Sequence, residues 1–292
     1  MRVSSRRPPL PPWGPDDASP AGVYTRLMAD EDVPAGGANG VANVLGRAVR
    51  VLRCFNADDD SLSARELIER TGLPRATVHR LAGDLVRLGL LTRTVSGRYA
   101  MGTLIWELGH LTHIHVRLRE TAQVHLTRLY DACGENVLLA VMTTDVPETA
   151  EVMYVGHIRG PRSVPIAAHE GARFPLHATA SGKALAATQS PAWLDRYLQR
   201  RFEAETRHTL TDPARLGEEI ARARSRGYAV QLEEMTLGGG AVAAAIPSGD
   251  DRPAAAIAVA ASAENWDERR LASLIKVTAR AIAKDLQAAG GA

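Results

Sequence analysis

The sequence predicts an α+β protein with two domains, a winged helix-turn-helix followed by an antiparallel β-sheet domain, joined by a linker helix. Two short helical segments with a glycine-containing turn between them, followed by a two-stranded ribbon, predict the first domain within residues 44–102. Strand-like runs with helical segments inserted between them predict the second domain within residues 119–288. The chain has 292 residues, 45% of them hydrophobic, which is enough to form two cores.

Composition excludes some classes of protein and leaves the chemistry open. The formal net charge of +2 creates no overall field for nucleic acid or membrane, so any basic surface must be local. The two cysteines, Cys54 and Cys133, form no CxxC zinc motif and are expected to be reduced thiols. No apolar run is long enough to span a membrane, so we expect a cytoplasmic protein without a membrane partner.

Residues 1–43 are predicted to be a disordered tail because they are rich in Pro, Gly, Asp and Ser and show no hydrophobic periodicity. The start of the tail is basic, but it lacks the apolar centre of a signal peptide. Translation could begin at Met28 instead of Met1, and the sequence does not distinguish between them.

The first domain is predicted from local helix signals. Residues 44–55 carry apolar side chains at helical spacing. Ser63 and Glu66 form an S-x-x-E capping box at the start of the second helix, and Gly72 ends that helix. Pro74 suits the first turn of the third helix, where its missing N–H costs nothing. One stripe of the third helix is expected to face the core: Val78, Leu81, Leu85 and Leu88.

The wing and the local charge indicate a DNA-binding surface. Residues 90–102 alternate and turn at Ser96–Gly97, which predicts a two-stranded ribbon. Between residues 44 and 102 there are ten arginines and six carboxylates, a local net charge of +4 that suits phosphates. The second helix of a helix-turn-helix places its start in the major groove. We expect DNA contacts from this helix and from the wing: Arg75, Ala76, Thr77, His79, Arg80, Arg93 and Arg98.

Residues 103–118 are predicted to be a linker helix. Apolar residues occupy more than one of its sides, and such a helix requires partners on two faces. Packing against a second subunit would provide one, so we expect a homodimer or homotetramer. The histidines of this segment do not share one helix face and no carboxylate or cysteine accompanies them, so we predict no metal site from His110, His113 and His115.

The second domain is expected to be an antiparallel sheet with helices around it, and the concave face of such a sheet can hold a small molecule. The predicted strands are 136–144, 151–158, 163–171, 228–234, 241–247 and 254–262. The predicted helices are 119–134, 179–188, 191–200, 212–225 and 265–287.

Four segments together resemble the IclR family of bacterial transcription regulators: LPRATVHRL, the wing ending in RYAMG, FPLHATASGKALAA and RGYAVQLEE. The resemblance extends from about residue 44 to residue 288, with the elements in the family's order. It implies an N-terminal winged helix, a linker helix that dimerises and a C-terminal GAF-like domain that binds a small effector. It also implies dimers, often paired into tetramers, that bind operator DNA.

The stretch FPLHATASGKALAA is the expected effector-binding scaffold. Thr179 can cap a helix beginning at Ala180, which leaves the N–H groups of Ala180 and Ser181 free to bind an acceptor or anion. His177 and Lys183 are expected to brace this turn, and neutralisation of a bound acid is the alternative role for Lys183. The resemblance implies further pocket residues: Ile166, Phe174, Gln231, Gly239, Ala241, Ala258 and Ala260.

Several of these positions depart from the family's pattern. Members that bind small organic acids tend to carry an acid, a cysteine and serines where this chain has Gln231, Ala241, Ala258 and Ala260. Without those groups, polar atoms of a ligand would lose hydrogen-bond partners. We therefore expect a less polar effector, such as a hydrophobic or aromatic acid, in an enlarged pocket. A vestigial pocket is the alternative.

The same stretch does not predict catalysis. A Walker loop requires G-x-x-x-x-G-K-[ST], but His177 stands in place of the first glycine and Ala184 follows Lys183. Ser181 and His177 have neither a G-x-S-x-G turn nor an evident orienting acid. We expect no cofactor and no enzymatic activity. The predicted function is an effector-responsive, sequence-specific transcriptional repressor, and a constitutive DNA-binding regulator is the alternative.

Overall fold

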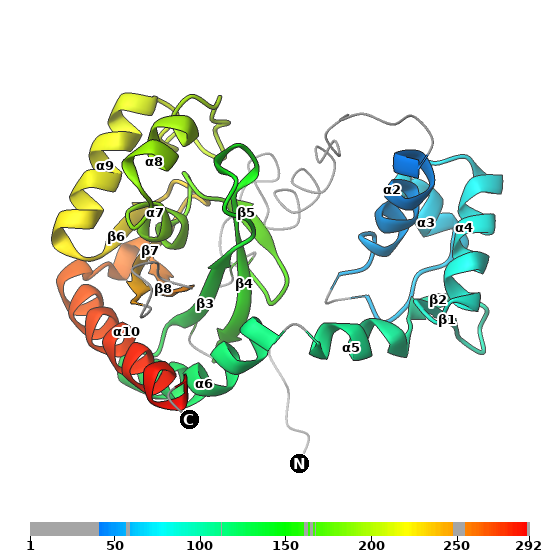
Figure 1. Cartoon of the computed structure of the whole chain (residues 1–292), viewed down its shortest axis with the longest axis horizontal. Coiled ribbons are helices and arrows are strands. Elements are labelled where there is room, and N and C mark those ends of the chain that lie inside the picture. Colours follow the sequence, from blue (N-terminus) through cyan, green and yellow to red (C-terminus); the bar gives the residue numbers. More distant parts are fainter. Residues whose placement is uncertain are drawn as a thin grey trace, which may run out of the picture.

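The computed structural model of the chain describes residues 41–56, 59–111, 113–160, 163, 166, 168–247 and 255–290. A small helical domain and a larger sheet domain are visible, and α5 (Thr103–His110) runs between them (Figure 1). Residues 1–40, which make up nearly all of the predicted disordered tail, lie outside the described residues. Within the described part of the chain, no helix is both long enough and apolar enough to cross a membrane.

The small domain is a winged helix-turn-helix. Its elements are α2 (Val41–Leu52), α3 (Ala64–Thr71), α4 (Arg75–Arg87), β1 (Leu91–Arg93) and β2 (Tyr99–Met101). The predicted capping box is confirmed, because Ser63 Oγ accepts from the Glu66 N–H at 3.2 Å and Glu66 Oε2 accepts from the Ser63 N–H at 2.7 Å. Gly72 ends α3 with a left-handed φ of 62°, as predicted. Pro74 occupies the N-cap of α4, one residue before the helix starts.

The buried stripe of α4 differs from the prediction at one position. Val78, Leu81 and Leu85 are buried, but Leu88 is 63% exposed. Leu88 is the C-cap residue, and the chain turns away there towards Gly89, whose φ is 74°. Because α4 ends at Arg87, the side chain of Leu88 does not follow the buried stripe of the helix into the core. Ala82, which was not predicted, is buried on α4.

The large domain is built on a six-stranded antiparallel sheet of order β5-β4-β3-β8-β7-β6. The strands are β3 (Asn136–Met142), β4 (Glu151–Ile158), β5 (Arg173–Pro175), β6 (Ala229–Leu232), β7 (Gly239–Ile246) and β8 (Ala255–Ser262). The helices are α6 (His113–Cys133), α7 (Ala180–Ala186), α8 (Pro191–Tyr197), α9 (Pro213–Arg226) and α10 (Glu268–Gly290), with short 3₁₀ turns at Pro147–Thr149 and Ala263–Asn265.

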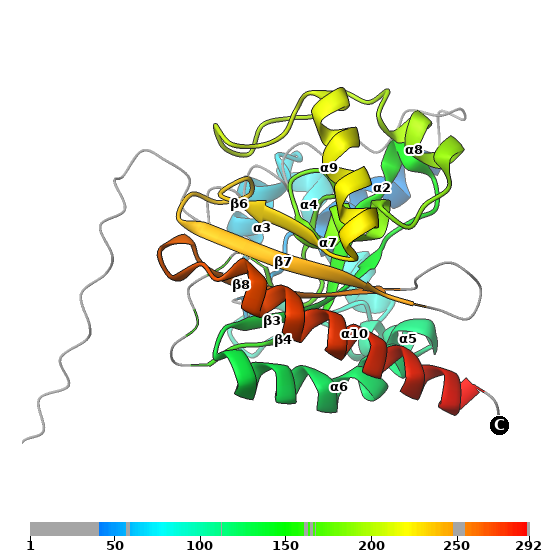
Figure 2. The same ribbon diagram turned by 90° about the vertical axis from the view of Figure 1, so that its left-hand side faces the viewer.

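Helices cover both faces of this sheet. Figure 2 shows α6 and α10 on one face and α7, α8 and α9 on the other. Side chains alternate along each strand, so Leu138 points into the core beneath α7 while Val137 and Leu139 point into the core beneath α6 and α10. The face beneath α7 is rich in buried alanines, and their small side chains let the helix lie close to the strands: Ala140, Ala241, Ala243, Ala256, Ala258 and Ala260.

Two predicted elements differ from the observed ones. The predicted strand 163–171 is not formed at its described residues, and β5 follows it after a turn at Gly171, whose φ is 86°. The predicted linker helix does not continue to residue 118. Instead α5 ends at His110 and α6 begins at His113, so residues 113–118 belong to the first helix of the large domain. Helical periodicity does not distinguish one continuous helix from two that meet at a break.

Candidate effector-binding and DNA-binding sites

The first turn of α7 is held by its predicted cap. Thr179 Oγ1 accepts from the Gly182 N–H and donates to the Pro175 carbonyl, both at 3.1 Å. The Lys183 N–H donates to the Thr179 carbonyl at 3.0 Å. The remaining first-turn N–H groups, those of Ala180 and Ser181, lie outside the helical hydrogen-bond ladder and keep their capacity to donate.

Gly182 allows this turn to pack tightly. A Cβ atom at this position would lie 2.3 Å from both the Cα and the carbonyl oxygen of Leu176. Because the obstacle is backbone, no rotamer change relieves it. The glycine in the stretch therefore serves close packing between α7 and the segment that precedes it, and not phosphate binding.

A cavity of about 70 Å³ lies between the start of α7 and the sheet. Eight of the ten predicted effector-binding residues line it: Ile166, Phe174, Thr179, Ala180, Gln231, Gly239, Ala241 and Ala260. The other two, Ser181 and Ala258, are each 1% exposed and are not part of its lining. This volume is well below the roughly 300 Å³ or more of typical small-molecule sites, so the enlarged pocket expected from the alanines is not observed. Ala241 and Ala260 border the cavity, while the other alanines of this face pack in the core beneath α7.

Gln231 and Tyr154, which line the cavity, carry groups that can donate hydrogen bonds. Gln231 Oε1 accepts from the Glu234 N–H at 3.0 Å and from the Met235 N–H at 3.4 Å, an arrangement that leaves its amide nitrogen available to donate. Tyr154 also lines the cavity; its phenol is protonated at neutral pH at its ordinary pKa of 10, and burial raises that pKa to about 12. These donors suit a ligand with hydrogen-bond acceptors, such as a carboxylate or a phenol oxygen.

Seven of the fifteen residues that line the cavity were not predicted from the sequence: Leu138, Tyr154, Ala168, Met235, Thr236, Gly240 and Ala261. Tyr154 is the one among them with a phenol group. It lies on β4 with Val152, two residues before it, on the same core-facing side, so strand alternation could have placed it there. Ser181 lies close enough to Tyr154 to offset part of the rise in its pKa. The Ser181 hydroxyl is buried and forms no hydrogen bond of normal geometry with any described residue.

Lys183 braces the turn through a buried ion pair. Its ammonium group contacts Glu234 Oε1, and the two side chains are 0% and 10% exposed. Burial lowers the pKa of Lys183 and raises that of Glu234, while the contact between them opposes both shifts. Lys183 does not line the cavity, so it anchors α7 to the connection between β6 and β7. His177 also acts as a brace, because its Nε2 contacts the Glu203 carbonyl at 2.8 Å.

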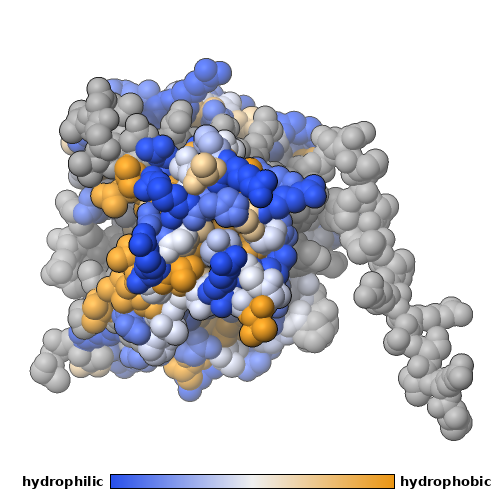
Figure 3. All heavy atoms as spheres, turned by 90° about the vertical axis from the view of Figure 1, so that its right-hand side faces the viewer, coloured by the Kyte–Doolittle hydropathy of each residue, from blue (hydrophilic) through white to orange (hydrophobic). Residues whose placement is uncertain are grey.

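The predicted DNA-contacting residues of α4 lie at its start, and most of them face solvent. Arg75, Ala76, His79 and Arg80 are exposed, and Thr77 is half-buried. Arg80 lies 3.5 Å from Asp84 and its side chain is still 58% exposed. Figure 3 shows that hydrophilic side chains cover much of this side of the molecule. The first turns of α4 therefore present donors and cations in the manner of a recognition helix.

The two wing arginines differ in their surroundings. Arg93 on β1 is exposed, lies 5.7 Å from the centroid of the Tyr99 ring and donates to the Gly97 carbonyl at 3.2 Å. Arg98 instead donates to Ser61, at 3.0 Å to Oγ and 2.7 Å to the carbonyl, and pairs with Glu66 at 3.0 Å. Its guanidinium is thus engaged in joining the wing to the start of α3, a role that the charge pattern alone did not indicate.

The histidines of the predicted linker lie among residues whose side chains are outside the described set. Among the described side chains, no group of three or more His, Cys, Asp or Glu residues is placed to hold a metal ion.

Comparisons with known proteins agree with this architecture. The model of the bacterial transcriptional regulator IclR C-terminal domain matches residues 110–288, and that of the IclR helix-turn-helix domain matches residues 44–94. An HTH-type transcriptional regulator of Mycobacterium tuberculosis is 34% identical over 220 residues, which are 74% of this chain and 80% of that protein. The transcriptional repressor IclR of Escherichia coli is 27% identical over 256 residues, which are 87% and 92% of the two chains.

A solved structure extends the likeness to both domains. The crystal structure of an IclR homolog from Microbacterium hydrocarbonoxydans, complexed with 4-hydroxybenzoate, has a TM-score of 0.74 and 28% identity to this chain. The match covers 84% of this chain and 99% of that one. The winged helix, the capped α7 and the two family models lead to the same assignment: the chain belongs to the IclR family of bacterial transcriptional regulators.

Proposed function

We propose that the chain is a transcriptional repressor that binds operator DNA through α4 and the wing and changes its affinity for DNA when a small aromatic or hydrophobic acid enters the cavity beside α7. The observation that carries the proposal is the cavity itself, because eight residues chosen from the sequence converge on it and its available polar groups are donors. The 4-hydroxybenzoate bound to the similar Microbacterium protein supports an acid of this class.

The assignment of DNA contacts follows the exposed groups. Arg75, His79 and Arg80 are proposed to reach base edges, and Arg93 is proposed to contact the phosphate backbone. Arg98 is proposed to stabilise the wing, because Ser61 and Glu66 already hold its guanidinium. As a DNA-binding regulator the protein would act in the cytoplasm, and neither proposed site suggests catalytic chemistry.

A homodimer or homotetramer is proposed from the surface of α5. On α5, Trp106 is 67% exposed and Leu108 is 51% exposed, and the C-cap residue Leu111 is 65% exposed. Adjacent exposed apolar side chains of this kind are typical of an interface. Two subunits joined there would present two copies of α4, as a palindromic operator requires.

A second candidate function, a constitutive DNA-binding regulator with a vestigial pocket, is favoured by the small volume of the cavity. An aromatic acid needs more room than about 70 Å³, so the proposed function requires α7 or the neighbouring strand ends to move outwards on binding. The two candidates differ in one observable property, a change of operator affinity with ligand.

The DNA-binding half is tested by a gel-shift titration on DNA upstream of the operons that neighbour the gene. Arg75→Ala and Arg80→Ala are each expected to weaken specific binding by about 1–3 kcal/mol, because each removes a base-edge contact. Arg87→Ala, at the far end of the same helix, is the matched control and is expected to bind as the native chain does. Native affinity in both test variants would contradict the placement of α4 in the major groove.

A further inference from the structure

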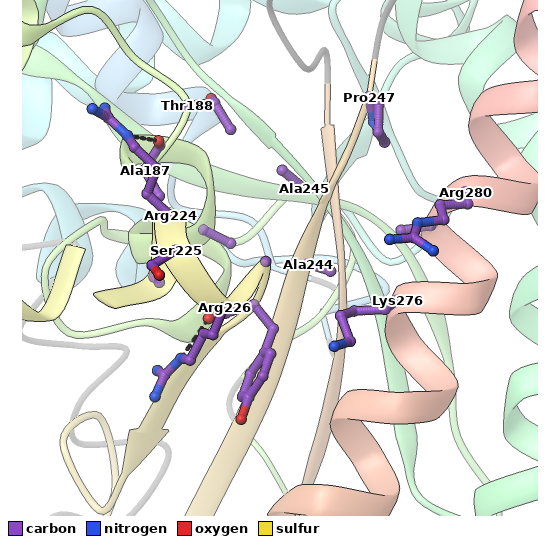
Figure 4. Close-up of a pocket in the computed structure, with 15 residues that line it drawn as sticks. Ala187, Thr188, Arg224, Ser225, Arg226, Ala244, Ala245, Pro247, Lys276 and Arg280 are labelled. Carbon is purple, nitrogen blue, oxygen red and sulfur yellow. Dashed lines mark hydrogen bonds between the residues drawn. The ribbon is translucent and has the colours of Figure 1, made fainter. Parts of the chain in front are cut away.

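A second and larger hollow lies at the other end of α7. It is a groove of about 570 Å³ between the C-terminal end of α9, the end of β7 and the middle of α10 (Figure 4). Its volume is within the range of small-molecule sites in proteins. The groove does not share a lining residue with the cavity that contains Gln231, so it is a separate place on the domain.

The described lining of the groove carries four cations and no carboxylate. Arg224 and Arg226 come from the end of α9, and Lys276 and Arg280 come from α10. Asp250 and Asp251, which follow Pro247 in the chain, lie outside the described residues. The floor between the two cationic walls consists of small apolar side chains: Ala184, Ala187, Ala244, Ala245 and Ala279.

The cations on the α9 side are fixed by the protein itself. Arg224 donates to the carbonyls of Ala187 and Gln189 at 2.6 and 2.7 Å, which orients the guanidinium without neutralising it. Arg226 pairs with Glu219 at 2.6 Å and lies 4.6 Å from the centroid of the Tyr228 ring. Because Glu219 pairs with Arg226 and also with Arg222 at 3.0 Å, and Arg224 is held by carbonyls alone, this wall contributes at least one uncompensated positive charge.

The cations on the α10 side keep their donors available. Lys276 lies 5.4 Å from the centroid of the Tyr228 ring, and neither it nor Arg280 forms an ion pair with a carboxylate in the described part of the chain. In Figure 4 both side chains extend from α10 towards β7. Three cations without a carboxylate partner in the described part of the chain therefore line one concave surface, and an anion bound there would reduce their mutual repulsion.

We propose that this groove binds a small anion with more than one negative charge, a phosphorylated or polycarboxylate metabolite. Lys276 and Arg280 bind its charged groups, and the alanines between the two walls contact its carbon skeleton. The positive charge of Arg224 attracts the anion from the opposite wall. Multiple charge is required because a single carboxylate neutralises only one of the three cations. The site is independent of the proposed effector cavity, so either can be wrong without the other.

Titration calorimetry on the full-length protein tests the proposal at constant ionic strength, with pyrophosphate and citrate as probes and acetate as the singly charged control. At least one probe is expected to bind, acetate is not, and the tighter of the two identifies phosphate or carboxylate as the preferred chemistry. Lys276→Gln combined with Arg280→Gln is expected to lower the affinity about tenfold or more, because two charge-assisted contacts are lost.

The matched control is Arg269→Gln combined with Lys284→Gln, two exposed cations of α10 that do not line the groove. This control changes the net charge equally and is expected to retain native affinity. Equal losses in both double variants, or acetate binding as tightly as the multiply charged probes, would overturn the proposal. Binding that occurs only after Asp250→Asn and Asp251→Asn are introduced would also overturn it, since the chain's own carboxylates would then fill the native groove.

Discussion

At the scale of single residues, Gly182 sets how closely α7 approaches the turn that precedes it. Replacing Gly182 by Ala forces a Cβ to within 2.3 Å of the Leu176 backbone, so we expect the free energy of unfolding to fall by about 1–3 kcal/mol. The decrease should appear as a lower urea midpoint with an unchanged slope.

Gly83 supplies the control for this substitution. It lies within α4, and a Cβ at this position would meet no atom within 4 Å. Gly83→Ala is therefore expected to stabilise its own domain by up to about 1 kcal/mol through helix propensity. If Gly182→Ala were as stable as the native chain, the tight packing of α7 would be wrong.

The half-buried His157 and the buried His177 make the large domain sensitive to acid. Burial, assisted by Arg159 and His169, lowers the pKa of His157 to about 4, while its Nε2 lies 3.1 Å from Asn136 Oδ1. Because the pKa in the folded state is below the ordinary value of 6.5, protonation favours unfolding. The stabilising effect of the neutral ring is complete above pH 6.5 and is lost as the pH falls towards 4.

The measurement is the urea midpoint as a function of pH across this window. His157→Gln should make the decline shallower, and part of the decline should remain because burial also lowers the pKa of His177. The control is His79→Gln, which replaces a histidine at an exposed position of α4 in the other domain. An unchanged slope in His157→Gln would show that acid acts elsewhere.

At the scale of elements, the boundaries that depend on local chemistry were predictable from sequence. The Ser63–Glu66 box, the left-handed Gly72 and the Thr179 cap each need only a few neighbouring residues, and all three are present. Boundaries that depend on packing were not predictable. The break before α6 and the position of β5 depend on which segments far apart in the sequence pack together. Hydrophobic periodicity does not indicate such contacts.

The effector site shows the same division. Its residues could be selected from sequence because they lie on a recognisable scaffold, but the size of the cavity could not. That size depends on how near α7 lies to Ala258 and Ala260, a distance set by packing through the whole domain. Strand alternation places Tyr154 on the core-facing side, but alternation does not show which core-facing side chains border a cavity, so Tyr154 was missed.

The ion pair between Lys183 and Glu234 joins α7 to the connection between β6 and β7. Lys183→Met leaves a buried carboxylate without its partner and is expected to cost about 3 kcal/mol or more of unfolding free energy. Adding Glu234→Leu removes the orphaned charge, so the double variant should be more stable than Lys183→Met alone. Additive losses in this double-mutant cycle would mean that the two side chains do not interact.

At the scale of the whole molecule, the proposed effector cavity and the proposed DNA-reading surface belong to different domains with α5 between them (Figure 1). A ligand shifts such a system only by the difference between its affinities for two arrangements of the chain. In the proposed function, the two arrangements differ in the size of the cavity. The described arrangement leaves little room for an acid, so the arrangement that binds the acid must have a larger cavity.

The most direct test is to measure operator affinity by fluorescence anisotropy with and without saturating aromatic acids, 4-hydroxybenzoate among them. The native protein is expected to change its operator dissociation constant by about fivefold or more with at least one acid. Ala260→Leu, which fills the cavity, should bind operator as the native chain does and lose the response. An acid that binds the native protein without altering operator affinity, or an Ala260→Leu variant that still responds, would contradict the account.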